Sequence, residues 1–185
     1  MRVLLPIVAA LALGACASTP TSSISESDGQ VVLGFSHIGE DYDSVMARAA
    51  LEYDVEPQCE ERKVSLLKQR KAFLYEICGF TPENQLFSDA TLAEVVYHFI
   101  GRDLVRVDVR AEGESALLNR VKDDMSSIFG ASKSTQSALG KNSYQWVAKQ
   151  HVAGVRAGTG GSAGNVHVRL LDGTLTDNAP WLAAE

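Results

Sequence analysis

The stretch "LAEVVYHFIGRDLVRVDVRAE" (residues 92–112) carries the clearest structural pattern in this chain. Large apolar residues alternate with other residues on both sides of Gly101, and a period of two is typical of half-buried β-strands. The stretch therefore predicts a β-hairpin with one apolar face. The residues of that face are Val95, Tyr97 and Phe99 in the first strand, then Val105, Val107 and Val109 in the second.

The loop of this hairpin decides which residues face each other. A two-residue turn at Gly101-Arg102 would set the apolar face of one strand beside the polar face of the other. A three-residue loop, 101–103, aligns the two apolar faces. Because register follows the buried face, we expect the longer loop, although its glycine is not at the usual last position. The expected pairs are Phe99–Val105, Tyr97–Val107, Val95–Val109 and Glu94–Arg110.

Two amphipathic helices are expected, one on each side of the hairpin along the chain. The first follows Asp41 or Asp43, either of which can cap its start. The second covers residues 115–130, where Ser115 can cap the start and Gly130 suits the position past the end. Their apolar positions are Val45, Met46, Ala49 and Tyr53 in the first helix, and Leu117, Val121, Met125 and Ile128 in the second.

Further strands are expected at three places. Residues 30–36, 143–157 and 165–171 have strand composition, and the last segment alternates clearly. Residues 54–63 contain a proline and several charges, which are typical of a loop.

Residues 64–80 fit either a strand or a helix, and aromatic content together with Gly79 favours a strand at 72–78. The expected fold class is therefore α+β, with an antiparallel sheet or sheets and two main amphipathic helices. Two tandem β-α-β units would explain the order of elements.

Length and composition bound the class of protein. The chain has 185 residues, of which 45% are hydrophobic, and this suits one globular domain with a substantial core. The formal net charge of −6 argues against a nucleic-acid partner, because phosphate binding needs a concentrated basic surface.

The N-terminal segment is too short to cross a membrane and fits an export signal. Arg2 precedes an almost wholly apolar run at 3–13, whereas a spanning helix needs about 20 apolar residues. The residues that follow, Leu13-Gly14-Ala15-Cys16, resemble the lipobox of bacterial lipoprotein precursors at all four positions. The resemblance implies that a signal peptidase recognises Leu13, Gly14 and Ala15. It also implies cleavage before Cys16, a diacylglyceryl group on the Cys16 thiol and acylation of the new amino group.

A lipidated cysteine implies a membrane location. Two or three acyl chains hold a protein durably, because each buried CH₂ adds about 0.8 kcal/mol. In lipoproteins of Gram-negative bacteria the following residue influences sorting, and Ala17 is not the aspartate that favours the inner membrane. We therefore expect outer-membrane anchoring, facing the periplasm. The expected organisation is a signal peptide at 1–15, a lipidated cysteine and flexible tether at 16–29, a globular domain at 30–175 and a C-terminal tail at 176–185.

The two other cysteines, Cys59 and Cys78, form an even pair in a chain expected to be exported. Export favours a disulfide between them, because an oxidising space lets such bonds persist. A metal site is a poor competitor, since the nearest downstream histidine, His98, lies 20 residues beyond Cys78. A redox-active pair would more often have C-x-x-C spacing. We expect a structural Cys59–Cys78 bridge, with no metal and no cofactor.

No convincing catalytic group emerges from the sequence. Ser36 and His37 are neighbours and cannot readily act as nucleophile and base toward each other. The histidines at 98, 151 and 167 lie on expected strands at positions that suit solvent exposure. The "GTGGSA" segment at 158–163 has the spacing of a dinucleotide loop but opens a strand where such a loop must open a helix.

Aromatic residues are the remaining candidates for contacts. Tyr144 and Trp146 alternate on one expected strand, which favours a place in the core. Trp181 lies in the tail, where it could contact a partner or fold back on the domain.

These observations together predict an outer-membrane-anchored periplasmic lipoprotein that acts as a non-catalytic binding or accessory factor of the cell envelope. Its partners would be membrane lipid through Cys16 and another envelope protein or glycan. A cell-wall-active enzyme or an envelope-displayed enzyme inhibitor is the alternative.

Overall fold

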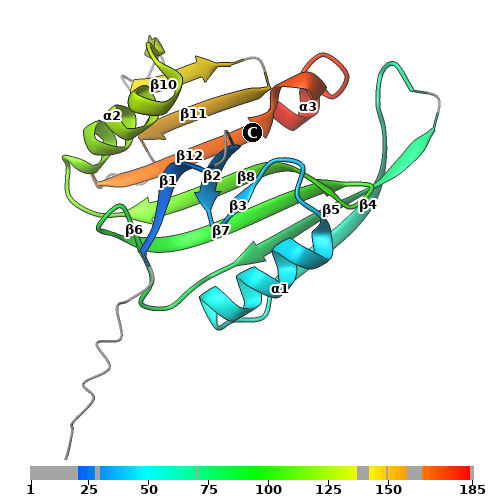
Figure 1. Cartoon of the computed structure of the whole chain (residues 1–185), viewed down its shortest axis with the longest axis horizontal. Helices are drawn as coiled ribbons and strands as arrows, with labels where there is room; N and C mark the ends of the chain where they lie inside the picture. Colours follow the sequence, from blue (N-terminus) through cyan, green and yellow to red (C-terminus); the bar gives the residue numbers. More distant parts are fainter. Residues whose placement is uncertain are drawn as a thin grey trace, which may run out of the picture.

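A large, mainly antiparallel sheet runs through the molecule, with α1 and α2 on one of its faces and α3 on the other (Figure 1). The computed structural model describes residues 21–27, 30–69, 71–136, 142–148, 150–157 and 164–183. Its first elements are β1 (Thr21–Ser27), β2 (Gln30–Gly34), β3 (Ser36–His37), α1 (Tyr42–Tyr53), β4 (Gln58–Ser65), β5 (Ala72–Phe80), β6 (Leu86–Phe87), β7 (Ala90–Ile100) and β8 (Asp103–Glu112). They are followed by α2 (Leu117–Phe129), β9 (Lys133–Gln136), β10 (Asn142–Val147), β11 (His151–Ala157), β12 (Asn165–Asp172), a 3-10 turn (Gly173–Leu175) and α3 (Pro180–Ala183).

The main sheet has the order β4-β5-β7-β8-β12-β11-β10-β9, and every neighbouring pair in it is antiparallel. Along the chain, α1 is followed by the strands β4, β5, β7 and β8, with the short β6 between β5 and β7. Likewise, α2 is followed by the four strands β9, β10, β11 and β12. The last strands of the two sets, β8 and β12, pair at the centre of the sheet. The structure thus confirms an α+β fold and shows a helix followed by an antiparallel sheet twice along the chain.

The β7–β8 hairpin combines the two loop alternatives. Its turn has only two residues, Gly101 and Arg102, both with positive φ, as the favoured hairpin turns require. An extra residue on β8, Val105, then shifts the register by one. The expected pairs Tyr97–Val107, Val95–Val109 and Glu94–Arg110 therefore form, but Phe99 pairs with Leu104 and not with Val105. The bulge thus restores the alignment of the two apolar faces that the three-residue loop was expected to provide.

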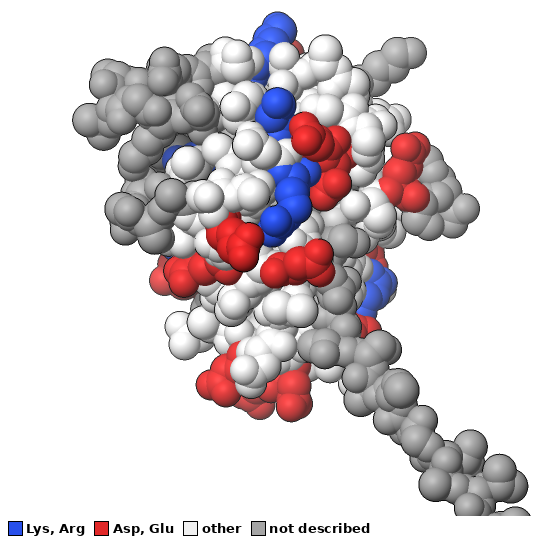
Figure 2. All heavy atoms as spheres, turned by 90° about the vertical axis from the view of Figure 1, so that its left-hand side faces the viewer, with Lys and Arg blue, Asp and Glu red and all other residues white. Residues whose placement is uncertain are grey.

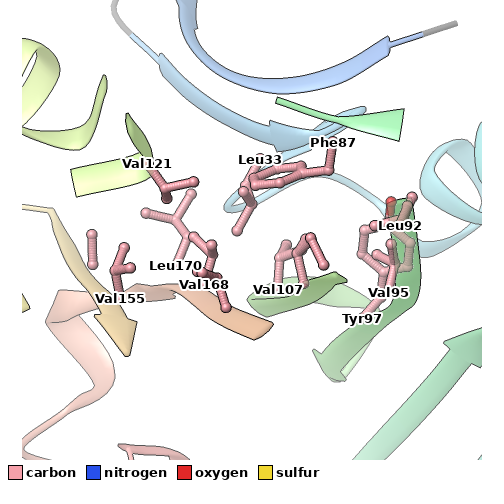
Figure 3. Packing of buried hydrophobic residues seen from close by; sticks show 14 of the residues in the cluster. Leu33, Phe87, Leu92, Val95, Tyr97, Val107, Val121, Val155, Val168 and Leu170 are labelled. Atoms are coloured by element: carbon pink, nitrogen blue, oxygen red, sulfur yellow. The ribbon is translucent and has the colours of Figure 1, made fainter. Parts of the chain in front are cut away.

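The principal core lies between one face of the sheet and a cover formed by α1, α2 and β2 (Figures 1 and 3). Both helices bury most of the stripe expected of them, with Met46 and Ile128 only partly buried, and Figure 3 shows Val121 of α2 and Leu33 of β2 lying over the sheet. Fully buried sheet residues complete this core, among them Val95, Tyr97, Val107, Val109, Val168 and Leu170.

The helix boundaries agree with the sequence except at one cap. The Asp41 side chain accepts a hydrogen bond from the Asp43 amide at 2.9 Å and caps α1. Gly130, with φ 80°, ends α2. The cap expected at Ser115 is wrong, because Ala116 precedes α2 and makes no side-chain cap bond.

Two segments that were not expected to be strands each form a strand. Residues 54–63 were expected to be a loop, yet β4 occupies Gln58–Ser65 and pairs with β5. The β4 side chains are nearly all exposed, so the segment shows no hydrophobic alternation, and its pairing with β5 makes it a strand. Similarly, Thr21–Ser27 were expected in the tether but form β1, which pairs with β2 and β6.

The segment at 143–157 is a hairpin and not the single strand expected. β10 and β11 pair with each other, and Trp146 lies opposite Ala153. Trp146 is buried, as expected, and its indole donates a hydrogen bond to the Gly130 carbonyl at 3.0 Å.

The C-terminal segment folds back onto the sheet. Ala179 and Leu182 are buried in a second apolar cluster with Leu66, Tyr75, Ile100 and Val105. Trp181 packs edge-on against the Tyr75 ring, with the centroids 4.9 Å apart. Of the two alternatives for Trp181, the structure therefore shows the fold-back.

Candidate functional site

The face of the sheet away from the principal core carries a cluster of charged side chains at its centre, which we call the arginine face. Alternation on β8 and β12 places it there, because the neighbouring valines and leucines of these strands point into the core. Cross-strand pairing then sets His98 opposite Arg106, and Asp108 opposite Arg169. The residues of the arginine face are Glu94, His98, Arg106, Asp108, Arg110, Arg156, His167 and Arg169.

Asp108 is the centre of this cluster and is 6% exposed. Its Oδ1 accepts hydrogen bonds from His167 Nε2 at 2.8 Å and from Arg169 Nε at 2.9 Å. Its Oδ2 lies 3.0 Å from His98 Nε2 and also accepts from Arg106 Nε. Four donors from three strands thus converge on one carboxylate, as a buried charge requires.

Hydrogen bonds fix the tautomers of both histidines. Arg156 Nε can only donate, so His167 Nδ1, at 2.9 Å, accepts, and the ring proton lies on the Nε2 that faces Asp108. His98 is held in the same way between Asp108 and the Tyr75 hydroxyl, which lies 2.7 Å from Nδ1. Both imidazoles therefore have both nitrogens engaged.

Burial and hydrogen bonding together set the directions of the pKa shifts in this cluster. Burial lowers the pKa of His98, and the hydrogen bond to Asp108 only partly offsets the effect. Burial alone would raise the pKa of Asp108, but hydrogen bonds from His167, His98 and Arg106 outweigh it and hold that pKa well below its usual range. Asp108 is therefore ionised throughout the physiological pH range.

The face is hollowed and carries net positive charge. A hollow of about 260 Å³ is lined by four arginines but only two carboxylates, in a chain whose net charge is −6. Arg110 reaches furthest into solvent, 3.0 Å from Glu94. On the side of the molecule shown in Figure 2, by contrast, the described Lys and Arg residues are interspersed with Asp and Glu. Local concentration of arginine on a sheet face is suited to binding an anion.

The geometry around His98 also contains the order hydroxyl–imidazole–carboxylate found in nucleophilic catalysis. Tyr75 is only 2% exposed and lies under Trp181, and burial raises the pKa of its hydroxyl. A substrate could not reach that hydroxyl in this conformation. The Tyr75–His98–Asp108 chain is therefore a structural connection between the second apolar cluster and the arginine face.

The site residues expected from the sequence lie elsewhere. Cys59 and Cys78 form the expected disulfide and sit opposite each other on β4 and β5. Trp181 covers Tyr75, and Leu13, Gly14, Ala15 and Cys16 lie outside the described residues.

The expectation that the histidines at 98 and 167 face solvent is wrong, since both are less than 10% exposed. The signal that could have found the cluster is the charged alternate positions of "RVDVR" and "HVR". Their pairing across β8 and β12 could not be read from the sequence.

Among the described residues, no helix has the length and apolar character that crossing a membrane requires, and no three metal-ligating side chains are grouped to hold an ion. Comparison of the chain with protein-family models, curated proteins and solved structures finds no match.

Proposed function

We propose that this chain is a lipid-anchored lipoprotein of the outer membrane, facing the periplasm, that binds another envelope component without catalysis. The observation that carries the binding role is the arginine face, a concave cationic surface backed by a rigid sheet. Its histidines already have both ring nitrogens engaged, which leaves them poorly placed to act as general bases.

Two further features support export and anchoring. The Cys59–Cys78 bridge is of the kind that persists in oxidising compartments. In addition, only residues 17–20 separate Cys16 from β1, and four residues span at most about 14 Å. Lipid on Cys16 would therefore hold the β1 end of the sheet close to the bilayer.

Anchoring is tested with Cys16→Ala in the full precursor. The parent is expected in the outer-membrane fraction with the mass of a cleaved, acylated chain, whereas the variant is expected to remain unprocessed and unlipidated. Normal processing and outer-membrane fractionation of the variant would contradict the anchor.

Binding is tested by placing a photo-crosslinking amino acid at Gln145, an exposed residue that borders the arginine face. The matched control places it at Leu51, which is 80% exposed on α1, the helix that covers the opposite face of the sheet. In intact cells we expect one envelope component to be captured at Gln145 and not at Leu51. Equal capture at both positions, or none at Gln145, would exclude the face as the binding surface.

The alternative, a cell-wall-active enzyme, draws its support from the Tyr75–His98–Asp108 chain. It predicts an activity on envelope material that His98→Gln removes while the fold is kept. A binding protein predicts that this variant loses only stability.

A further inference from the structure

A glycine lies on the arginine face where neither backbone nor packing requires one. Gly154, in the middle of β11, pairs with Arg169 on one side and Gln145 on the other. Its φ is not positive, and an added Cβ would first meet the Tyr144 carbonyl oxygen at 3.9 Å, an ordinary contact. Glycine weakens a strand interior and often marks a place where a ligand approaches the backbone.

The missing side chain leaves a hollow. Its volume is about 200 Å³, and it lies over β10, β11 and β12 with Gly154 in its floor. The polar residues around it are Ser143, Gln145, Arg156, His167 and Arg169. Since a water molecule occupies about 30 Å³ in the liquid, the hollow has room for a small polar group.

The charge at this hollow is positive. Arg156 and Arg169 line it and no carboxylate of the described residues does, whereas Asp108 lines the adjoining hollow and accepts from both Arg106 and Arg169. Burial lowers the pKa of the Arg156 guanidinium, and the charge of Arg169 lowers it further. An anion would relieve this repulsion, and its attraction to the two charges does not depend on which N–H groups already have partners.

We propose that the Gly154 hollow binds one oxyanion group, a carboxylate or a phosphate, of the envelope ligand, with Arg156 and Arg169 supplying the charge and Gly154 the space. This inference rests on the proposed function, because it names the chemistry that the arginine face recognises. The group enters against the backbone of β11, where a guanidinium can meet two of its oxygens.

The test titrates the mature lipidated protein in detergent micelles with inorganic phosphate and, separately, with acetate. Choline chloride at matched ionic strength is the control for screening. The arginine Nε signals are followed by NMR. Saturable shifts that chloride does not produce are expected with phosphate, acetate or both, and the anion that binds tighter identifies the class. Shifts with neither anion would overturn the proposal.

Gly154→Val fills the hollow and should weaken anion binding at least tenfold, while a β-branched residue keeps or raises the unfolding midpoint. Gly154→Ala is the milder version should valine disturb the fold, and it should weaken binding several-fold.

Gly79→Val is the matched control. Gly79 lies on the same sheet face in β5, and its added Cβ would likewise meet a carbonyl oxygen, that of Gln58, at 3.9 Å. It should leave binding unchanged.

Parental affinity in both Gly154 variants, or equal loss in Gly79→Val, would overturn the assignment. Because the crosslinking at Gln145 does not use these anions, the binding role can fail or hold independently of this result.

Discussion

The two faces of β8 and β12 are built from the same strands by opposite means. Toward the principal core, Val107, Val109, Val168 and Leu170 are fully buried and pack within the hydrophobic cluster. On the other face, Arg106, Asp108 and His167 are nearly as buried and Arg169 is partly buried, but each is held by hydrogen bonds or ion pairs. Apolar burial is non-directional, whereas a buried charge is tolerated only with its partners in place.

This difference indicates what a substitution disturbs on each face of the sheet. The core face depends on volume, and a smaller apolar residue leaves a cavity there. The arginine face depends on one carboxylate, Asp108, which offsets the charges around it. We therefore expect that a substitution on the core face changes stability without changing binding. At Gly154 on the arginine face, we expect a substitution to change binding without lowering stability.

The largest effect is expected for Asp108→Asn, which leaves the buried guanidinium groups without their counter-charge. We expect a loss of about 3–5 kcal/mol in the free energy of unfolding, measured with urea. The control is Glu94→Gln, whose carboxylate is partly exposed and pairs with Arg110, so its loss should stay within about 1 kcal/mol. Equal losses in the two variants would contradict the claim that Asp108 is the essential counter-charge of the arginine face.

On the core face, Leu170→Ala should cost about 2–5 kcal/mol, through lost burial and the cavity left behind. Because Leu170 points away from the arginine face, the folded variant should bind anions with parental affinity. A loss of affinity as large as that of Gly154→Val would show that the two faces are energetically coupled.

Removal of the disulfide tests the β4–β5 edge of the sheet, where Cys78 belongs to the principal core and Cys59 lies on the outermost strand. Cys59→Ser combined with Cys78→Ala should lower the free energy of unfolding by about 3 kcal/mol in the chain-entropy model, since the bond closes a loop of 19 residues. Alanine is chosen at position 78 because Cys78 is fully buried. Unchanged stability relative to the parent would mean that the β4–β5 pairing already restrains the unfolded chain.

We expect a smaller and gradual change in the free energy of unfolding as the pH is lowered. Because burial lowers the pKa of His98, the unfolded chain binds more protons than the folded one just below pH of about 6.5, and stability should fall as pH drops through that range. Asp108, whose folded pKa is depressed, should add a further loss below pH of about 4.

Urea unfolding at several pH values measures both losses. His98→Gln should flatten the upper part of the profile, while the contribution of His151, whose pKa burial also lowers, remains. An unchanged slope above pH 5 in this variant would contradict the assignment.

Much of the fold could be predicted because it follows local periodicity. The alternation in residues 92–112 predicted the hairpin and three of its four cross-strand pairs, and the helical stripes were predicted at the positions that α1 and α2 bury. The missed features, β4, the β10–β11 turn and the Val105 bulge, lack a periodic signal of their own, since pairing with a neighbour defines each of them.

The sequence singled out individual residues of the candidate site, but it did not predict that they are buried or that they cluster. The histidines at 98 and 167 were expected to face solvent because a polar residue on a strand usually does. Which strand lies beside β8 depends on a pairing across more than fifty residues, and that pairing turns an exposed stripe into a buried cluster around Asp108.

By itself, the sequence determined the alternation of the strands, the amphipathic helices and the pairing of Cys59 with Cys78, because short-range spacing and chemistry specify these. The lipid anchor at Cys16 rests on the sequence alone and stays a prediction. Only the tertiary structure decided that β8 and β12 lie side by side, that the C-terminal segment covers Tyr75, and that four arginines share one face. The physical reason is that these features arise from contacts between distant segments, whose energies exist only once the chain has folded.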